Sequence, residues 1–128
     1  MKILLDTHAF LWAISEPDRL SSRARDILRA GNNNVYFSVA SAWEIAIKMK
    51  LGKLRLPDLP DRYIPKELAV AAIDVLPIQL SHTLRTFHLP EHHRDPFDRL
   101  LIAQAQLENM PLMTSDPHIL RYEVTTIW

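Results

Sequence analysis

Short, wholly apolar runs alternate along the chain with longer segments whose apolar residues recur at helical spacing. The apolar runs predict strands over residues 3–5, 35–37, 75–78, 111–113 and 124–127. The helical pattern predicts helices over residues 9–14, 22–30, 38–49, 65–72, 81–89 and 95–109. Apolar runs without alternation are typical of strands buried in a parallel sheet. The sequence therefore predicts an α/β fold, a three-layer α/β/α sandwich around a parallel sheet, formed by a single domain over residues 1–128.

Residues 95–105 carry the clearest local signal in the chain. Asp95 is a good N-cap, and Pro96 suits the first helical position, where a missing N–H costs little. Asp98 shares its helix face with Ile102, and that face is small and apolar apart from the carboxylate. A solvated face would carry more charge, and a core face would carry no acid. The pattern therefore predicts a buried helix that holds an acid at the wall of a cleft.

Four acids fall at or just after the predicted carboxyl ends of strands, or on helix N-termini that face that edge: Asp6, Glu44, Asp98 and Asp116. Each has a purely structural interpretation when it is taken alone. Asp6 could end a strand, Glu44 could form a capping box with Ser41, and the other two could stabilise helix N-termini.

Taken together, the four acids favour a functional site. The carboxyl ends of parallel strands meet at one rim of a sheet, so these carboxylates would crowd there and raise one another's pKa values. A hard divalent cation neutralises such a cluster, and oxygen ligands without cysteine fit Mg²⁺ or Mn²⁺ rather than zinc. The usual chemistry of such a site is the hydrolysis of a phosphodiester by metal-activated water.

Composition excludes several other functions. The chain has no cysteine, which excludes disulfides, thiolate metal sites and a cysteine nucleophile. Its two glycines, Gly31 and Gly52, cannot form a P-loop or a dinucleotide-binding fingerprint. The opening apolar run is too short for a signal peptide, and no stretch approaches the length of a membrane span. We therefore expect a cytoplasmic protein without a membrane partner.

The charge balance limits how the chain could bind nucleic acid. Lys and Arg number 15, as do Asp and Glu, so the formal net charge is zero and no global field attracts a polyanion. A contact with RNA would need local basic residues next to the acidic rim. The candidates for such contacts are Lys48, Lys50, Lys53, Arg94 and Arg99.

Four segments resemble, in order, the motifs of PIN domains: residues 1–8, 38–45, 95–105 and 112–116. The set is most similar to VapC-like toxins of type II toxin–antitoxin pairs. The resemblance implies a small Mg²⁺-dependent endoribonuclease with an RNA substrate, a cognate antitoxin as partner and a homodimeric state. By position, it implies that the catalytic and metal-binding residues are Asp6, Glu44, Asp98 and Asp116, with Thr114, Ser115 and Asp95 as supporting candidates.

Two other functions remain open at this point. A phosphoaspartyl-type phosphatase would use Asp6 as its nucleophile. Such enzymes usually have a second aspartate two residues later, where this chain has His8, and they need a placed lysine that the sequence does not identify. A non-catalytic RNA- or protein-binding module of the same fold is the second alternative, although the presence of all four acids argues against it.

The aromatic residues near these motifs have simpler interpretations. His92 and His93 are adjacent and would point in different directions, so we expect them in a solvated loop rather than in a metal site. Trp12, Trp43 and Trp128 are expected to pack in the core rather than to stack on nucleobases.

Overall fold

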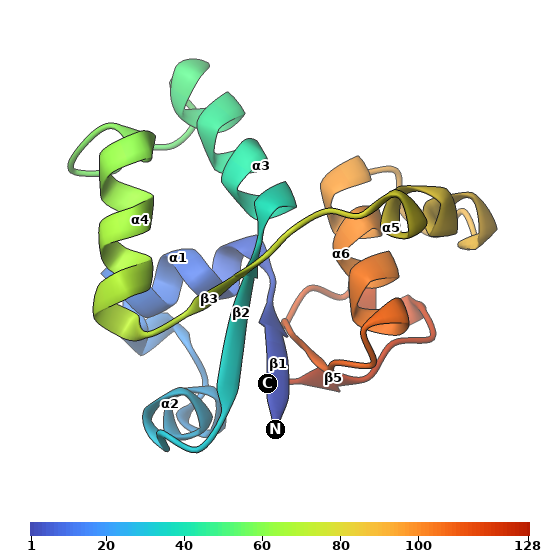
Figure 1. Cartoon of the computed structure of the whole chain (residues 1–128), viewed down its shortest axis with the longest axis horizontal. Helices are drawn as coiled ribbons and strands as arrows, with labels where there is room; N and C mark the ends of the chain where they lie inside the picture. Colours follow the sequence, from blue (N-terminus) through green and yellow to red (C-terminus); the bar gives the residue numbers. More distant parts are fainter.

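The computed structural model describes residues 1–128 and is built on a five-stranded parallel sheet (Figure 1). Its strands are β1 (Lys2–Leu5), β2 (Asn34–Ser38), β3 (Asp74–Leu76), β4 (Leu112–Met113) and β5 (Thr126–Ile127). Their order in the sheet is β3-β2-β1-β4-β5, and every neighbouring pair is parallel. The first strand in the sequence is thus the central strand, as its uninterrupted apolar run predicts.

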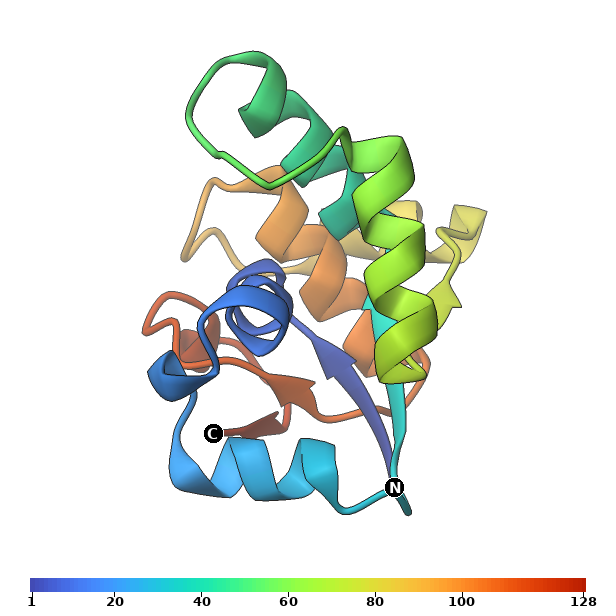
Figure 2. The same ribbon diagram turned by 90° about the vertical axis from the view of Figure 1, so that its left-hand side faces the viewer.

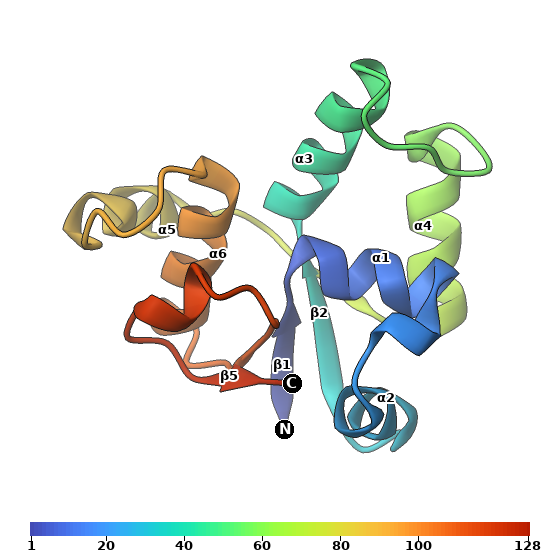
Figure 3. The same ribbon diagram turned by 180° about the vertical axis from the view of Figure 1, so that it is seen from behind.

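Six α-helices lie in the connections: α1 (Thr7–Ser15), α2 (Ser22–Arg29), α3 (Val39–Lys50), α4 (Pro60–Ala71), α5 (Leu80–Arg85) and α6 (Pro96–Leu107). Three short 3₁₀ turns are η1 (Pro17–Arg19), η2 (Thr86–His88) and η3 (Ile119–Arg121). Helices α1, α2 and α4 lie on one side of the central strands, and α5 and α6 lie on the other (Figures 1 and 3). Figure 2 shows α1 and α2 in front of the strands, with α6 behind. None of these helices combines the length and hydrophobicity needed to cross a membrane.

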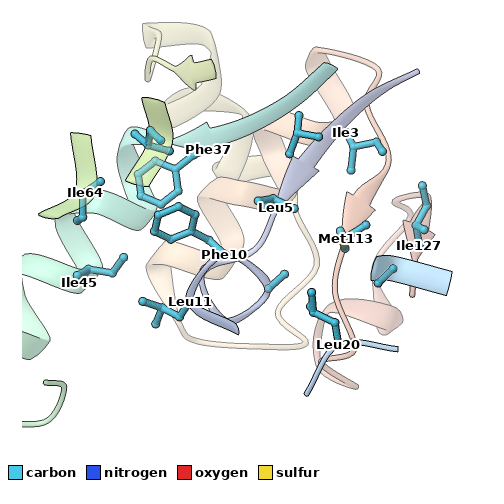
Figure 4. Close-up of a cluster of buried hydrophobic side chains, with 14 residues drawn as sticks. Ile3, Leu5, Phe10, Leu11, Leu20, Phe37, Ile45, Ile64, Met113 and Ile127 are labelled. Atoms are coloured by element: carbon cyan, nitrogen blue, oxygen red, sulfur yellow. The ribbon is translucent and has the colours of Figure 1, made fainter. Parts of the chain in front are cut away.

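The side chains of β1 enter two hydrophobic cores, one on each face of the sheet. Ile3 and Leu5 join the core formed with α1, α2, α3 and α4, where the Phe10 and Phe37 rings meet with centroids 4.2 Å apart (Figure 4). Leu4 points to the other face and joins the core formed largely by α6. Because both faces are covered, the predicted three-layer sandwich is confirmed.

Helix α4 is the largest departure from the predicted elements, since it begins at Pro60 rather than at Pro65. Pro60 occupies the first turn, where a missing N–H costs little. Pro65 lies on the exposed side inside the helix. Ile64 and Leu68 are one turn apart and both buried, so core packing continues the helix through Pro65. The helix ends at Ala71, and the C-cap residue Ala72 adopts a left-handed conformation with φ of 54°.

Candidate active site

The carboxyl ends of the three central strands lie level with one another. Leu5 of β1 is in register with Phe37 of β2 and with Met113 of β4. The chain turns polar immediately after each of these positions, at Asp6, Ser38 and Thr114, and all three side chains are buried. The strand register therefore brings polar groups from three segments to a single edge of the sheet.

Helices α1 and α3 begin at this edge, and the polar residues cap them. Asp6 Oδ1 accepts a hydrogen bond from the Ala9 N–H at 2.7 Å, and for this reason α1 begins two residues earlier than the apolar pattern predicts. Ser38 Oγ accepts from the Ala40 N–H at 3.0 Å at the start of α3. Asp6 and Ser38 thus each lie where a strand ends, at this edge of the sheet, and cap the next helix.

Helix α6 also begins here, and Asp95 is its N-cap. Asp95 Oδ1 accepts from the N–H groups of Phe97 and Asp98 at 2.8 and 3.2 Å, which confirms the predicted cap. Pro96 lies in the first turn, as expected. The carboxylate of Asp98 does not cap the helix; its Oδ2 lies 3.0 Å from His93 Nε2. The Asp95 carboxylate therefore accepts hydrogen bonds from the backbone, whereas the Asp98 carboxylate points away from the helix.

A pocket of about 170 Å³ opens at this edge and has no hydrophobic lining. Residues of α1, α3 and α6, of the loop before α6 and of the loop after β4 form its walls. They are Asp6, Thr7, His8, Glu44, Lys48, His93, Asp95, Asp98 and Asp116. The four acids singled out in the sequence line this single pocket, which we call the acidic pocket.

Glu44 lies on the inner face of α3 with its side chain only 5% exposed. The Thr7 hydroxyl lies 2.6 Å from its Oε1, and Lys48 Nζ lies 2.6 Å from its Oε2. The capping-box interpretation of Glu44 with Ser41 is wrong, because Ser38 caps the helix and Ser41 Oγ lies 2.9 Å from the Thr7 hydroxyl instead. The hydrogen bond with Glu44 raises the pKa of Lys48, which keeps this lysine charged inside the pocket.

Burial raises the pKa of Asp98 to about 7. The negative charges of Asp95, Glu44 and Asp116 act in the same direction, while the hydrogen bond with His93 opposes the shift. The carboxyl group is therefore protonated in part of the metal-free molecules at neutral pH. The raised pKa of Asp98 thus reflects burial first, and after it the crowding of acids that the sequence predicts.

The donor atoms in the acidic pocket suit a divalent cation. Burial also raises the pKa of Asp6, although the hydrogen bonds of Asp6 with Thr114 and with the backbone of α1 act to lower it. His93, Asp98 and Asp116 each offer a ligand atom, and these three atoms lie within 4.8 Å of one another. Carboxylate and imidazole donors without sulfur fit hard or borderline ions such as Mg²⁺ and Mn²⁺.

Arg99 does not fit its expected role as an RNA contact. Its guanidinium donates to the carbonyl oxygens of Pro90 at 2.8 Å and Thr86 at 2.9 Å, and it lies 3.2 Å from the Tyr122 hydroxyl. The side chain is only 12% exposed, so it holds the segment before α6 in place rather than facing solvent. The other basic candidates outside the pocket are exposed: Lys50, Lys53 and Arg94.

His93 is the pocket residue that the sequence interpretation placed wrongly. The expected solvated loop is contradicted by a side chain that is 21% exposed and bonded to Asp98. Thr7, which contacts Glu44, received no prediction at all. A loop histidine and a single hydroxyl produce no periodic signal, so only proximity to the predicted acids could have marked them.

The two supporting candidates after β4 behave differently. The Thr114 hydroxyl accepts from the Asp116 N–H at 3.0 Å and also bonds to Asp6, so it links two acids of the pocket. The Ser115 side chain is exposed and does not line the pocket. The structure thus connects only Thr114 to the acids.

The tryptophans are divided between core and surface. Trp12 and Trp128 pack against the core beside α1, as expected. Trp43 is 60% exposed, which contradicts the expected core position, and its ring meets Phe97 edge-on with centroids 5.5 Å apart. These two rings directly precede Glu44 and Asp98 in the chain, and of the pair only Trp43 is exposed while Phe97 is half-buried.

Sequence comparison decides the family. The family described as PIN domain matches residues 3–124, which is nearly the whole chain. The chain belongs to the PIN domain family. It is also 36% identical over 62 residues to Ribonuclease VapC16 of Mycobacterium tuberculosis. That match covers 48% of this chain and only 44% of the relative.

Solved structures share the fold along the entire chain. VapBC2 from Rickettsia felis, bound to a DNA fragment from its promoter, contains a chain that matches with a TM-score of 0.74 and 17% identity, over 100% of this chain and 98% of its own. A chain of DNA-bound VapBC from Salmonella typhimurium matches with a TM-score of 0.70 and 14% identity, over 100% and 97%. At these identities the likeness shows the fold alone, and it agrees with the three-layer PIN-like architecture.

The raised pKa of Asp98 predicts that the metal-free protein loses stability as the pH rises from about 4 to about 7. In this range the folded state keeps a proton on Asp98 that the unfolded chain releases, so unfolding is favoured as protons become scarce. In EDTA, Tm should therefore fall by several degrees between pH 5 and pH 7.5, since about 1 kcal/mol moves Tm of such a domain by about 4 °C. Asp98→Asn should flatten this dependence, whereas the exposed control Asp26→Asn should not. A wild-type Tm that rises over this range would contradict the assigned shift.

The capping role of Asp95 predicts that two substitutions differ in stability. Asparagine caps a helix about as well as aspartate, whereas alanine loses about 1 kcal/mol. Denaturant unfolding in EDTA should thus find Asp95→Asn at least as stable as the wild type, because it also removes a negative charge beside Asp98. Asp95→Ala should be less stable than Asp95→Asn by about that amount. Equal stabilities for the two variants would show that the cap contributes nothing.

Proposed function

We propose that this chain is a metal-dependent endoribonuclease that acts in the cytoplasm as the toxin of a toxin–antitoxin pair. The observation that carries the proposal is the acidic pocket, where Asp6, Glu44, Asp98 and Asp116 converge from separate segments of a PIN domain. The 36% identity to a protein named a ribonuclease supports the choice of RNA as the substrate. The phosphatase alternative has no such support, since the only lysine in the pocket pairs with Glu44 rather than with Asp6.

In this proposal the four acids hold Mg²⁺ or Mn²⁺ and are the catalytic residues. A bound ion of this kind supplies charge neutralisation at a phosphodiester and lowers the pKa of a water. The chain's own contribution is to fix the acids. Asp6 is oriented by Thr114 and by the N-terminus of α1. Glu44 is oriented by Thr7 and Lys48. Asp95 begins the helix that presents Asp98. Each acid is thereby held before a substrate arrives.

The surface around the pocket supports binding of a single RNA strand. Lys48 lies in the pocket, and Lys50, Lys53 and Arg94 are exposed candidates for contacts with phosphates. The exposed ring of Trp43 offers a face on which a base could stack. The chain is formally neutral, so RNA would be attracted by these local basic residues and the aromatic ring rather than by the net charge of the whole protein.

Two features support the proposed protein partners. A hollow of about 720 Å³ beside α1 shares Thr7, His8 and Lys48 with the acidic pocket, so an antitoxin segment lying in it would border the acids. Chains of the same fold occur in a structure described as VapBC2 bound to a promoter DNA fragment and in one described as a toxin–antitoxin complex. Leu80, Leu84 and Phe87 are large, exposed and close in sequence, which supports a homodimer through α5 and η2.

The nuclease proposal predicts cleavage of labelled RNA that EDTA abolishes and Mg²⁺ or Mn²⁺ restores. Asp98→Asn and Asp6→Asn should reduce the rate by orders of magnitude with the fold intact, since asparagine keeps the cap at Asp6 but not the charge. Asp95→Asn should retain much of the activity, and the distant Asp26→Asn should retain all of it. Products should carry 5′-phosphate and 3′-hydroxyl ends. Cleavage that persists in excess EDTA, or 2′,3′-cyclic ends, would refute the mechanism.

The toxin proposal predicts a growth defect that a neighbouring gene reverses. Induction of the wild type in a bacterial host should arrest growth, whereas Asp98→Asn should be tolerated at equal protein levels. A small protein encoded beside this chain should bind it and inhibit RNA cleavage in vitro. If the host tolerates high levels of active wild type without that neighbour, the toxin role fails while the nuclease role stands.

A further inference from the structure

We propose that His93 is a direct nitrogen ligand of the cation in the acidic pocket, together with Asp98 and Asp116, and that the pocket therefore prefers Mn²⁺ over Mg²⁺. This inference rests on the metal site of the proposed function, but it does not depend on RNA cleavage. It assigns a role to the one pocket histidine that the chain holds against an acid of the site.

The ligand atoms already lie at suitable separations. His93 Nε2 is 3.0 Å from Asp98 Oδ2, and these atoms and a carboxylate oxygen of Asp116 all lie within 4.8 Å of one another. An octahedral ion with bonds of about 2.1 Å places adjacent ligand atoms about 3 Å apart and opposite ones about 4.2 Å apart. Small side-chain movements would therefore bring all three atoms onto one ion.

The His93 ring is positioned by contacts that do not involve the acids. Its backbone N–H donates to the Tyr122 hydroxyl at 2.9 Å, and its carbonyl oxygen accepts from Arg99 Nη1 at 3.4 Å. Its ring stacks on His118 with centroids 4.4 Å apart and an interplanar angle of 5°. Backbone and ring are thus both fixed, as expected for a ligand whose orientation other residues control.

A simpler alternative is that His93 only orients Asp98 by donating a hydrogen bond to it. In that case Nε2 keeps its proton and cannot bind a cation. If His93 is a ligand, the proton lies on Nδ1 and the Nε2 lone pair faces the ion. The two roles differ in whether nitrogen is bonded to the metal, which spectroscopy detects directly.

The donor set also determines which ion is preferred. Oxygen donors suit Mg²⁺, whereas imidazole favours first-row transition ions, and Mn²⁺ accepts carboxylate and imidazole together. Replacing one oxygen ligand by His93 should therefore shift the preference of the pocket from Mg²⁺ toward Mn²⁺.

Electron spin-echo envelope modulation of the Mn²⁺-loaded protein provides the test. The wild type should show ¹⁴N modulation from a coordinated imidazole, and His93→Gln, which can still donate a hydrogen bond to Asp98, should lose it. His8→Gln and His92→Gln are matched controls and should retain the modulation. Competition titrations should find Mn²⁺ preferred over Mg²⁺ in the wild type, and the ratio of the two affinities should fall in His93→Gln.

The outcomes separate this inference from the proposed function. Mn²⁺ binding without ¹⁴N modulation, or with modulation that survives in His93→Gln, would overturn the role of His93 and leave the metal-dependent nuclease intact. Failure of the wild type to bind Mn²⁺ or Mg²⁺ at all would overturn both. Modulation lost only in His93→Gln supports the ligand assignment.

Discussion

The alignment of three strand ends is the constraint on which the rest of this molecule depends. Because Leu5, Phe37 and Met113 share one register, the first polar residue after each strand reaches the same edge of the sheet. Two helices then begin on that edge, and a third, α6, starts beside it. A slip of one residue in any of these pairs would turn core side chains to the opposite face of the sheet and move the polar residue after the strand away from this edge.

Burial and helix N-termini act in opposite directions on the acids at this edge. The N–H groups at the start of α1 favour the charged form of Asp6, yet burial outweighs them and its pKa is raised. Asp98 has no such backbone partner for its carboxylate and lies among other acids. Asp6 and Asp95 thus both cap a helix and carry a negative charge in the pocket. An alanine substitution at either residue therefore weakens a helix N-terminus and changes the electrostatics of the pocket together.

The sequence predicts features that depend on neighbouring residues, and it predicts less well those that depend on distant contacts. The apolar runs identified all five strands, and the Asp95–Pro96 pair identified the start of α6 to the residue. It did not predict that α4 would continue through Pro65, because burial of Ile64 against the core decides that. Two further differences, for Arg99, expected as an RNA contact, and for His93, expected in a solvated loop, have the same cause. Only the folded chain brings the carbonyl groups near Arg99 and the acid near His93.

The pairing of Lys48 with Glu44 means that the pocket carries a cation of its own. This ammonium group is tethered one helical turn from its partner, so its local concentration is high and dilution does not remove it. An incoming metal ion would compete with this ammonium group for Glu44. The apparent affinity for the metal would then reflect the difference between the binding free energies of the two cations. In the proposed nuclease, an RNA phosphate that draws Lys48 away would remove the competitor, and substrate and ion would then strengthen each other's binding through one shared side chain.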